Sequence, residues 1–187
     1  ILRDNQSNLF KSHISKMLKS KIDLIITSGA VSAGKYDFVP SVVRNFQLSN
    51  YFKSVAIRPG KPILFAKMKG KPKAVFGLPG NPISSAACFR FFVYPYIRGL
   101  LGIKEEISFK ARLKNEFRKK NDFTRFVKSK LSTTKNGKLE VEILKGQESF
   151  RIKSFIQSNI WVMLPSGKER FKKGETVDCF FPNQPNN

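Results

Sequence analysis

The sequence is poor in the residues from which many catalytic and metal sites are built. Its 187 residues include one histidine, His13, and two cysteines, Cys88 and Cys179. This composition nearly excludes a histidine-based catalytic triad or a His/Cys metal cage. The cysteines lie far apart without metal-ligand spacing, so we expect two reduced thiols in a cytoplasmic protein, neither of them catalytic.

Acidic residues are also scarce. The chain has 13 Asp and Glu against 35 Lys and Arg, a formal net charge of +22. A field of this sign attracts nucleic acid, membrane surfaces or phosphorylated small molecules. The lysines are spread along the whole chain, which is typical of charges that solvate a surface. We therefore favour this interpretation over nucleic-acid binding, and a basic nucleic-acid binder stays open as an alternative. We expect no membrane partner, and no apolar run is long enough to span a bilayer.

The first residues, Ile1 to Asp4, include no initiator methionine and no signal-peptide pattern. They resemble the interior of a domain, so we expect the chain to be a fragment of a longer protein. At 187 residues it is long enough for one large domain or two small ones with a hydrophobic core.

Hydrophobic periodicity predicts an α/β domain over residues 1–103 and a small, mostly β domain over 104–187. The predicted elements of the first domain are a helix at 5–20, strands at 24–27, 52–57, 63–67 and 74–76, and helices at 38–46 and 83–101. Pro95 is expected to kink the last helix. The predicted strands of the second domain lie near 107–117, 122–131, 138–144, 158–164 and 176–181.

Three glycine-bearing segments stand out. They are Thr27 to Asp37 (TSGAVSAGKYD), Arg58 to Pro62 (RPGKP) and Leu78 to Pro82 (LPGNP). The first follows the apolar run Leu24 to Ile26, which is typical of a buried strand in a parallel sheet. A loop at the carboxyl end of such a strand presents backbone N–H groups, and glycine allows close approach. The segments therefore indicate a site for phosphate or another oxyanion.

Together these segments resemble the molybdopterin molybdenumtransferase (molybdenum insertase) family, which includes the E domain of gephyrin. Ser84 and the later segment Gly174 to Val177 (GETV) extend the likeness over nearly the whole chain, whereas Ala30 replaces a glycine usual in the family. The resemblance implies a three-layer αβα molybdopterin-binding-like domain, truncated at its N-terminus, followed by a small β-barrel-like domain. It also implies that two further N-terminal domains are absent.

The activity that the resemblance implies is the insertion of molybdate into adenylylated molybdopterin. A divalent metal ion, normally Mg²⁺, assists cleavage of the pyrophosphate bond, and AMP is released. The full-length parent is expected to be a homodimer. One alternative is a non-catalytic fragment or scaffold that binds pterin phosphate or a peptide. Another is molybdopterin adenylyltransferase, against which the β domain argues because that enzyme consists of the α/β domain alone.

The resemblance also implies roles for individual residues. The catalytic set is Asp37, Lys53, Arg58 and Lys61, and the metal carboxylates are Asp4 and Asp37. The substrate-binding set is Ser28, Gly29, Ser32, Gly34, Pro79, Gly80, Asn81, Pro82, Ser84, Arg125 and Ser149.

Simpler interpretations stay open for several of these residues. Asp4 and Asp37 also suit helix N-caps, Gly60 and Gly80 also suit plain turns, and Lys53, Arg58 and Arg125 also suit solvated surface charges.

Overall fold

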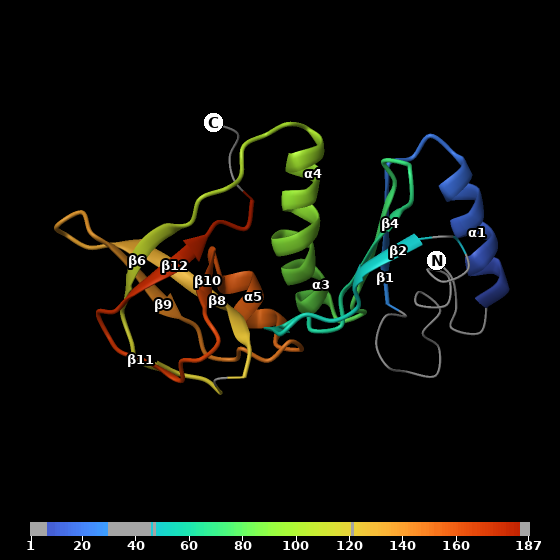
Figure 1. Ribbon diagram of the computed structural model, residues 1–187. Helices are drawn as coiled ribbons and strands as arrows, with labels where there is room; N and C mark the ends of the chain where they lie inside the picture. The colour runs from blue at the N-terminus through green and yellow to red at the C-terminus, as the bar shows by residue number, and fades with distance from the viewer. Residues whose placement is uncertain (1–6, 30–45, 47, 121, 184–187) are drawn as a thin grey trace. The chain divides into compact units, whose positions relative to one another are not determined.

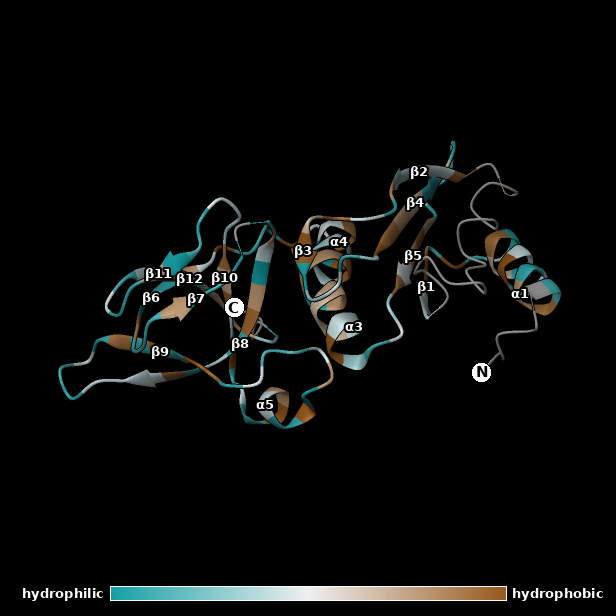
Figure 2. Cartoon of the chain, turned by 90° about the horizontal axis from the view of Figure 1, so that it is seen from below, coloured by the Kyte–Doolittle hydropathy of each residue, from teal (hydrophilic) through white to brown (hydrophobic). Residues whose placement is uncertain are grey.

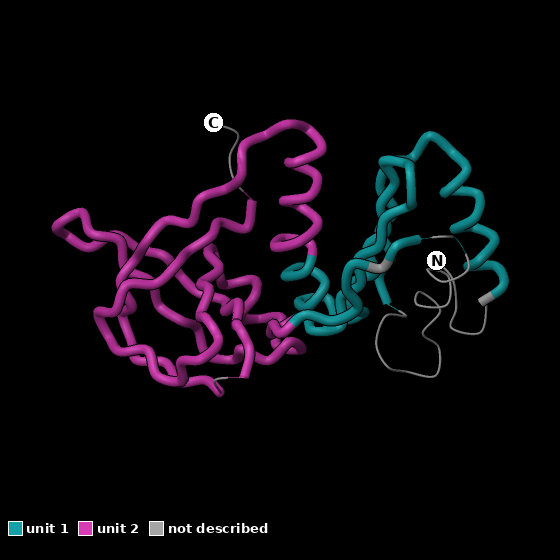
Figure 3. Tube along the Cα trace, viewed as in Figure 1, with its two compact units in different colours: residues 1–55, 60–88 teal, residues 56–59, 89–187 magenta. Residues whose placement is uncertain are grey.

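The computed structural model describes residues 7–29, 46, 48–120 and 122–183. The chain divides into two compact units (Figure 3): unit 1 contains residues 1–55 and 60–88, and unit 2 contains residues 56–59 and 89–187. The RPGKP segment runs from one unit into the other, since Arg58 and Pro59 belong to unit 2 and Gly60 and Lys61 to unit 1.

Unit 1 is built on a four-stranded sheet in the order β1-β5-β4-β2 (Figure 1). The strands are β1 (Leu24–Ser28), β5 (Ala74–Leu78), β4 (Leu64–Met68) and β2 (Leu48–Phe52). β1 and β5 are parallel, whereas β4 is antiparallel to both β5 and β2. The parallel pairing predicted for the strand after Lys21 is therefore confirmed, but Ile26 is exposed, so this strand is not buried on both faces.

Helix α1 (Ser7–Lys19) packs on this sheet through one apolar face. Ile14 and Leu18 are buried with Ile25 of β1 and Val75 of β5. Hydrophobic and hydrophilic residues alternate around the helix (Figure 2), as expected for the amphipathic helix that the sequence predicts. None of the described helices is long and apolar enough to cross a lipid bilayer.

The predicted strand at 52–57 is wrong, because its residues belong to different units. β2 ends at Phe52, whose ring centroid lies 5.5 Å from that of Phe65 in unit 1. Ile57 and Arg58 form β3, which joins the sheet of unit 2 instead. The predicted strand thus joins the end of one strand to the start of another across the polar residues Lys53 and Ser54.

The long helix predicted at 83–101 is interrupted. It consists of α3 (Pro82–Cys88), a π-helical turn η1 (Phe89–Val93) and α4 (Tyr94–Leu100). Pro95 lies in the first turn of α4, where its missing N–H is least costly. A regular α-helix through this point would leave a carbonyl without its donor, and the wider π turn accommodates the proline.

Unit 2 contains a closed five-stranded barrel. Its strands are β6 (Phe109–Leu113), β8 (Thr124–Thr133), β9 (Leu139–Ile143), β10 (Ile160–Leu164) and β12 (Thr176–Phe180). The order β10-β12-β6-β9-β8 closes because β8 also pairs with β10. β3 (Ile57–Arg58) adds a parallel partner to β8, and β7 (Phe117–Arg118) pairs with β11 (Arg170–Phe171). The predicted β-barrel-like domain is confirmed.

Two elements of unit 2 lie outside every predicted range, the short strand β11 and the helix α5 (Ile152–Gln157). Six residues are too few to establish a helical period in the sequence. The helix predicted at 38–46 lies outside the described residues except for Phe46.

Both cysteines are buried free thiols. Burial raises the pKa of Cys88 to about 12 and that of Cys179 to about 12. Neither thiol ionises near neutral pH, which agrees with the expectation that neither is catalytic.

Candidate functional site

Two of the three glycine segments meet at one edge of the unit 1 sheet. β1 and β5 are parallel neighbours with Ser28 opposite Leu78, so their carboxyl ends coincide. Beyond them the amide nitrogen of Gly29 donates a hydrogen bond of 2.9 Å to the carbonyl oxygen of Leu78. The hydroxyl of Ser28 lies 3.5 Å from the carbonyl oxygen of Pro79. Gly29 has a φ of +83°, a value that favours glycine.

Gly80 approaches the first segment closely. A Cβ atom placed on Gly80 would lie 3.5 Å from the Cα atom of Gly29. Gly80 is exposed, whereas Pro79 before it is buried. The structure thus brings Ser28, Gly29, Pro79 and Gly80 together as the sequence predicts, although their binding role stays a prediction.

Asn81 caps helix α3. Its Oδ1 atom accepts hydrogen bonds from the backbone nitrogens of Ile83 at 3.1 Å and Ser84 at 3.2 Å, and Pro82 is the first residue of the helix. This is the N-cap geometry expected for asparagine. Ser84 is buried, so its side chain lies inside unit 1 rather than on its surface.

The RPGKP segment is fixed to the rest of unit 1 by its backbone. The carbonyl oxygen of Gly60 lies 3.4 Å from the thiol of Cys88 at the end of α3. The carbonyl oxygen of Lys61 accepts hydrogen bonds from Val55 at 3.1 Å and Ile63 at 2.9 Å. The side chains of Lys61 and Lys53 are exposed, as a role in binding anions requires.

Unit 2 holds a cluster of Arg58, Arg125 and Asp122, which we call the arginine cluster. Arg58 on β3 and Arg125 on β8 are partners in the ladder between these strands. The guanidinium of Arg58 forms an ion pair of 3.3 Å with Asp122 and lies 4.9 Å from the ring centroid of Phe123. The cluster therefore has two guanidinium groups and one carboxylate.

Arg125 is the unusual member of the cluster. Its Nε atom is buried and has no hydrogen-bond partner among the described residues. Burial, and next the charge of Arg58, lower the pKa of Arg125, while Asp122 and Glu148 oppose this shift. A buried donor without a partner is costly, so this arrangement favours an acceptor supplied from outside the chain.

Lys119 adds a third cation to this region and was not predicted as a site residue. Its side chain is buried, and its ammonium donates hydrogen bonds to the carbonyl oxygens of Phe123 at 2.9 Å and Lys120 at 3.1 Å. Burial is the main cause of the lowered pKa of Lys119, and the charge of Arg125 contributes to it. In the sequence Lys119 stands between Arg118 and Lys120, so nothing distinguishes it from solvated charges.

Ser149 lies in the segment that joins β9 to α5, which we call loop 144–151. The carboxylate of Glu148, its neighbour, acts on the pKa of Arg125, so the loop is electrostatically coupled to the arginine cluster. Ser149 itself is half-buried. Arg125 and Ser149, which the resemblance paired as substrate-binding residues, thus belong to one region of unit 2.

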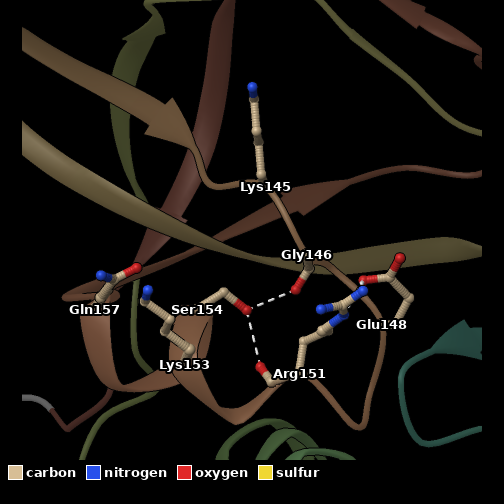
Figure 4. A pocket seen from close by; sticks show the side chains of 7 residues that line it. All are labelled: Lys145, Gly146, Glu148, Arg151, Lys153, Ser154 and Gln157. Atoms are coloured by element: carbon tan, nitrogen blue, oxygen red, sulfur yellow. Dashed lines mark hydrogen bonds and ion pairs between the residues drawn. The ribbon is translucent and has the colours of Figure 1, made fainter.

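A cavity of about 390 Å³ opens where this loop meets α5 (Figure 4). Its lining residues are Lys145, Gly146, Glu148, Arg151, Lys153, Ser154 and Gln157. Three of them are cations and one is an anion, so the cavity has an excess of positive charge. It was missed in the sequence because its lysines look like the many others of this chain.

The remaining predicted site residues, Asp4, Ser32, Gly34 and Asp37, lie outside the described part of the chain. Within the described part, no three His, Cys, Asp or Glu side chains gather where they could hold a metal ion. Asp4 and Asp37, the carboxylates predicted to hold Mg²⁺, lie outside this part and stay predictions.

Comparison with known proteins relates both units to one family. The model of a probable molybdopterin binding domain matches residues 1–99, and that of the MoeA C-terminal region (domain IV) matches residues 110–180. A molybdopterin molybdenumtransferase of Staphylococcus aureus (strain COL) is 36% identical over 168 residues, 88% of this chain and 39% of the relative. One of Staphylococcus epidermidis (strain ATCC 35984) is 36% identical over 174 residues, 91% of this chain and 41% of the relative.

Solved structures agree with these relatives. The crystal structure of a molybdopterin biosynthesis MoeA protein from Pyrococcus horikoshii has a TM-score of 0.71 at 27% identity, covering 96% of this chain and 42% of that one. The chain thus spans about two fifths of the length of the relatives it matches. With a molybdopterin-binding domain followed by a domain IV, it belongs to the molybdopterin molybdenumtransferase (MoeA) family.

Proposed function

We propose that this chain binds the pterin and the oxyanion in an enzyme that inserts molybdate into adenylylated molybdopterin and releases AMP. The relatives are named for transfer of molybdenum to molybdopterin, which supports this reaction class. The observation that carries the proposal is the buried Nε atom of Arg125, which has no hydrogen-bond partner in the described chain and lies beside Arg58.

Molybdate suits the arginine cluster because it is a tetrahedral dianion with four acceptor oxygens. Two neighbouring guanidinium groups repel each other, and the one carboxylate of the cluster, Asp122, forms an ion pair with Arg58. A dianion would remove this repulsion and supply an acceptor for Arg125. Guanidinium groups are suited to this task because their donors form a fixed fork.

We assign the pterin phosphate to the glycine loops of unit 1. Gly29 and Gly80 carry no side chain and lie against each other, so a ligand can approach their backbone closely. The exposed cations Lys53 and Lys61 would neutralise charge on the pyrophosphate. Cleavage of a phosphoanhydride depends mainly on such positioning and charge neutralisation. Asp4 and Asp37 would hold a divalent cation, which when bound would further neutralise the negative charge of the pyrophosphate.

A chimera tests the proposed function. This chain replaces the matching segment of the S. aureus relative, and incorporation of radiolabelled molybdate into adenylylated molybdopterin is measured together with AMP release. We expect turnover by the chimera and its loss in the Asp37→Asn variant. Binding without turnover would instead support the non-catalytic alternative, and cofactor formation that survives Asp37→Asn would remove the catalytic assignment of Asp37.

We also propose that the full-length protein is a cytoplasmic homodimer. Sedimentation equilibrium of the chimera tests the oligomeric state, and a monomer at all concentrations would contradict the proposal.

A further inference from the structure

Lys128 is a fully buried cation in the middle of strand β8. Its side chain is 1% exposed, and its ammonium donates hydrogen bonds to the carbonyl oxygens of Gly146 at 2.8 Å, Glu148 at 3.1 Å and Arg151 at 3.3 Å. An ammonium group has three donors, so one loop occupies all of them. Burial lowers the pKa of Lys128, and the charge of Glu148 opposes this shift.

Gln147 fastens the same loop to β8 at a second point. Its Nε2 atom donates to the carbonyl oxygens of Lys128 and Leu144, both at 2.7 Å, and its Oε1 atom accepts from the backbone nitrogen of Lys128 at 2.9 Å. The side-chain amide therefore bonds the backbone N–H and C=O groups of Lys128 as a neighbouring strand would. The polar groups of Gln147 and Lys128 are satisfied by one another and by the loop.

Loop 144–151 is also held from the side of α5. The hydroxyl of Ser154 lies 2.6 Å from the carbonyl oxygen of Gly146 and 2.9 Å from that of Arg151 (Figure 4). Gly146 has a φ of +76°, and an added Cβ atom would lie 3.5 Å from the Cβ atom of Arg151. The base of the loop therefore packs against Ser154 of α5 and against Arg151.

The tip of the loop is not buried in this way. The Glu148 side chain is 54% exposed and Phe150 is 68% exposed, with Ser149 between them. Arg125 lies three residues before Lys128 on β8, and Glu148 acts on its pKa. One strand thus carries both a member of the arginine cluster and the cation that shapes the loop beside it.

We propose that Lys128 and Gln147 are positioning residues, which hold loop 144–151 so that the hydroxyl of Ser149 meets the anionic ligand of the arginine cluster. The ammonium of Lys128 orders three carbonyl oxygens as a bound metal ion would, but it is part of the chain. This inference rests on the proposed function, because it assigns the ordered loop to the same ligand. A lysine with only a structural role would stabilise the barrel without changing ligand binding.

Three variants at matched positions test this role. Lys128→Met removes the ammonium, Lys128→Arg keeps a cation with several donors, and Lys130→Met removes an exposed charge from the same strand. Amide hydrogen exchange of residues 144–151 and the dissociation constant for molybdate are measured in each, with thermal unfolding as the check of folding. If Lys128→Met does not fold, Gln147→Ala replaces it.

We expect Lys128→Met to raise both the exchange rates in the loop and the dissociation constant by about tenfold, since three hydrogen bonds to one cation are lost. Lys128→Arg should recover part of both effects, and Lys130→Met should match the wild type. Equal molybdate affinities in all folded variants would overturn the positioning role alone. If the wild-type protein binds no molybdate, either as this chain or in the chimera, both the proposed function and the positioning role are overturned. The exchange rates would still report whether Lys128 orders the loop.

Discussion

Gly29 donates a backbone hydrogen bond of 2.9 Å to Leu78, and this bond joins two glycine segments that are far apart in the sequence. The bond continues the parallel ladder of β1 and β5 beyond its last paired residues, Ser28 and Leu78. The conformation of one loop therefore fixes the start of the other. Substitutions that change the backbone at Gly29 should affect both loops.

The positive φ of Gly29 gives the first prediction. Gly29→Ala should lower the free energy of unfolding by about 1 kcal/mol, because an L-residue is strained in this region. Among the described residues, no atom beyond Gly29 and its chain neighbours lies within 4 Å of the added methyl group, so the expected cost comes from the backbone and not from a clash with them. Gly99→Ala in helix α4 is the matched control, also without a contact within 4 Å, and should stabilise by up to about 1 kcal/mol. Urea unfolding measures both, and equal effects would contradict the prediction.

The second prediction separates two roles of Asn81. Asn81→Ala removes the acceptor for the nitrogens of Ile83 and Ser84 and should cost about 1 kcal/mol of stability. Asn81→Asp keeps an acceptor at the cap, so its stability should equal that of the wild type or exceed it. If the loop binds an anionic pterin, the added carboxylate should nevertheless weaken binding by about tenfold through repulsion. Calorimetric titration with adenylylated molybdopterin decides, and unchanged affinity in Asn81→Asp would remove Asn81 from the site.

The sequence predicts the fold well where local patterns agree with the final contacts. Helical periodicity identifies α1, the apolar run Leu24 to Ile26 identifies β1, and alternation of apolar residues identifies the strands of the barrel. The sequence-based prediction fails at 52–57, where Lys53 and Ser54 follow the end of a strand of one unit and precede a strand of the other. It also fails at α5, which is too short to show a period.

The candidate site could be predicted only where it depends on local motifs. Gly29 and Gly60 were identifiable because their turns have positive φ values, of +83° and +105°, and Asn81 because it precedes a helix. Lys119 and Lys128 could not be identified, since only the tertiary structure buries them among 35 basic residues. The sequence around a lysine in a strand does not indicate whether three carbonyl oxygens will accept hydrogen bonds from its ammonium group.

The third prediction concerns Arg125, where stability and binding should change in opposite directions. Arg125→Met removes a buried donor without a partner in the described chain and the repulsion from Arg58. The free energy of unfolding should stay the same or rise, because replacing a buried, poorly compensated charge by an apolar side chain is often stabilising. Molybdate affinity should fall at least about tenfold with the loss of one charge-assisted contact.

Arg112→Met is the control for Arg125→Met, because Arg112 is an exposed cation on β6 of the same barrel. It should change neither molybdate affinity nor stability appreciably. If both variants weaken binding equally, the anion responds to the overall charge of the chain and not to the arginine cluster.

The last prediction is a pH dependence that originates at Asp178. Hydrogen bonds from Lys110 at 2.6 Å and from Ser108 at 2.5 Å lower the pKa of Asp178 below its ordinary value of 3.8. Since the folded state holds this proton more weakly than the unfolded state, the carboxylate stabilises the fold above about pH 4, and this contribution is lost as the pH falls through the lowered pKa. Asp178→Asn should therefore be less stable than the wild type at pH 7, and the difference should shrink as the pH falls through the lowered pKa of Asp178. Lys110→Met removes the main cause of the lowered pKa, so the stability of this variant should also depend less on pH than that of the wild type. Urea unfolding between pH 2 and pH 7 measures all three proteins, and parallel curves for wild type and Asp178→Asn would show that Asp178 does not contribute.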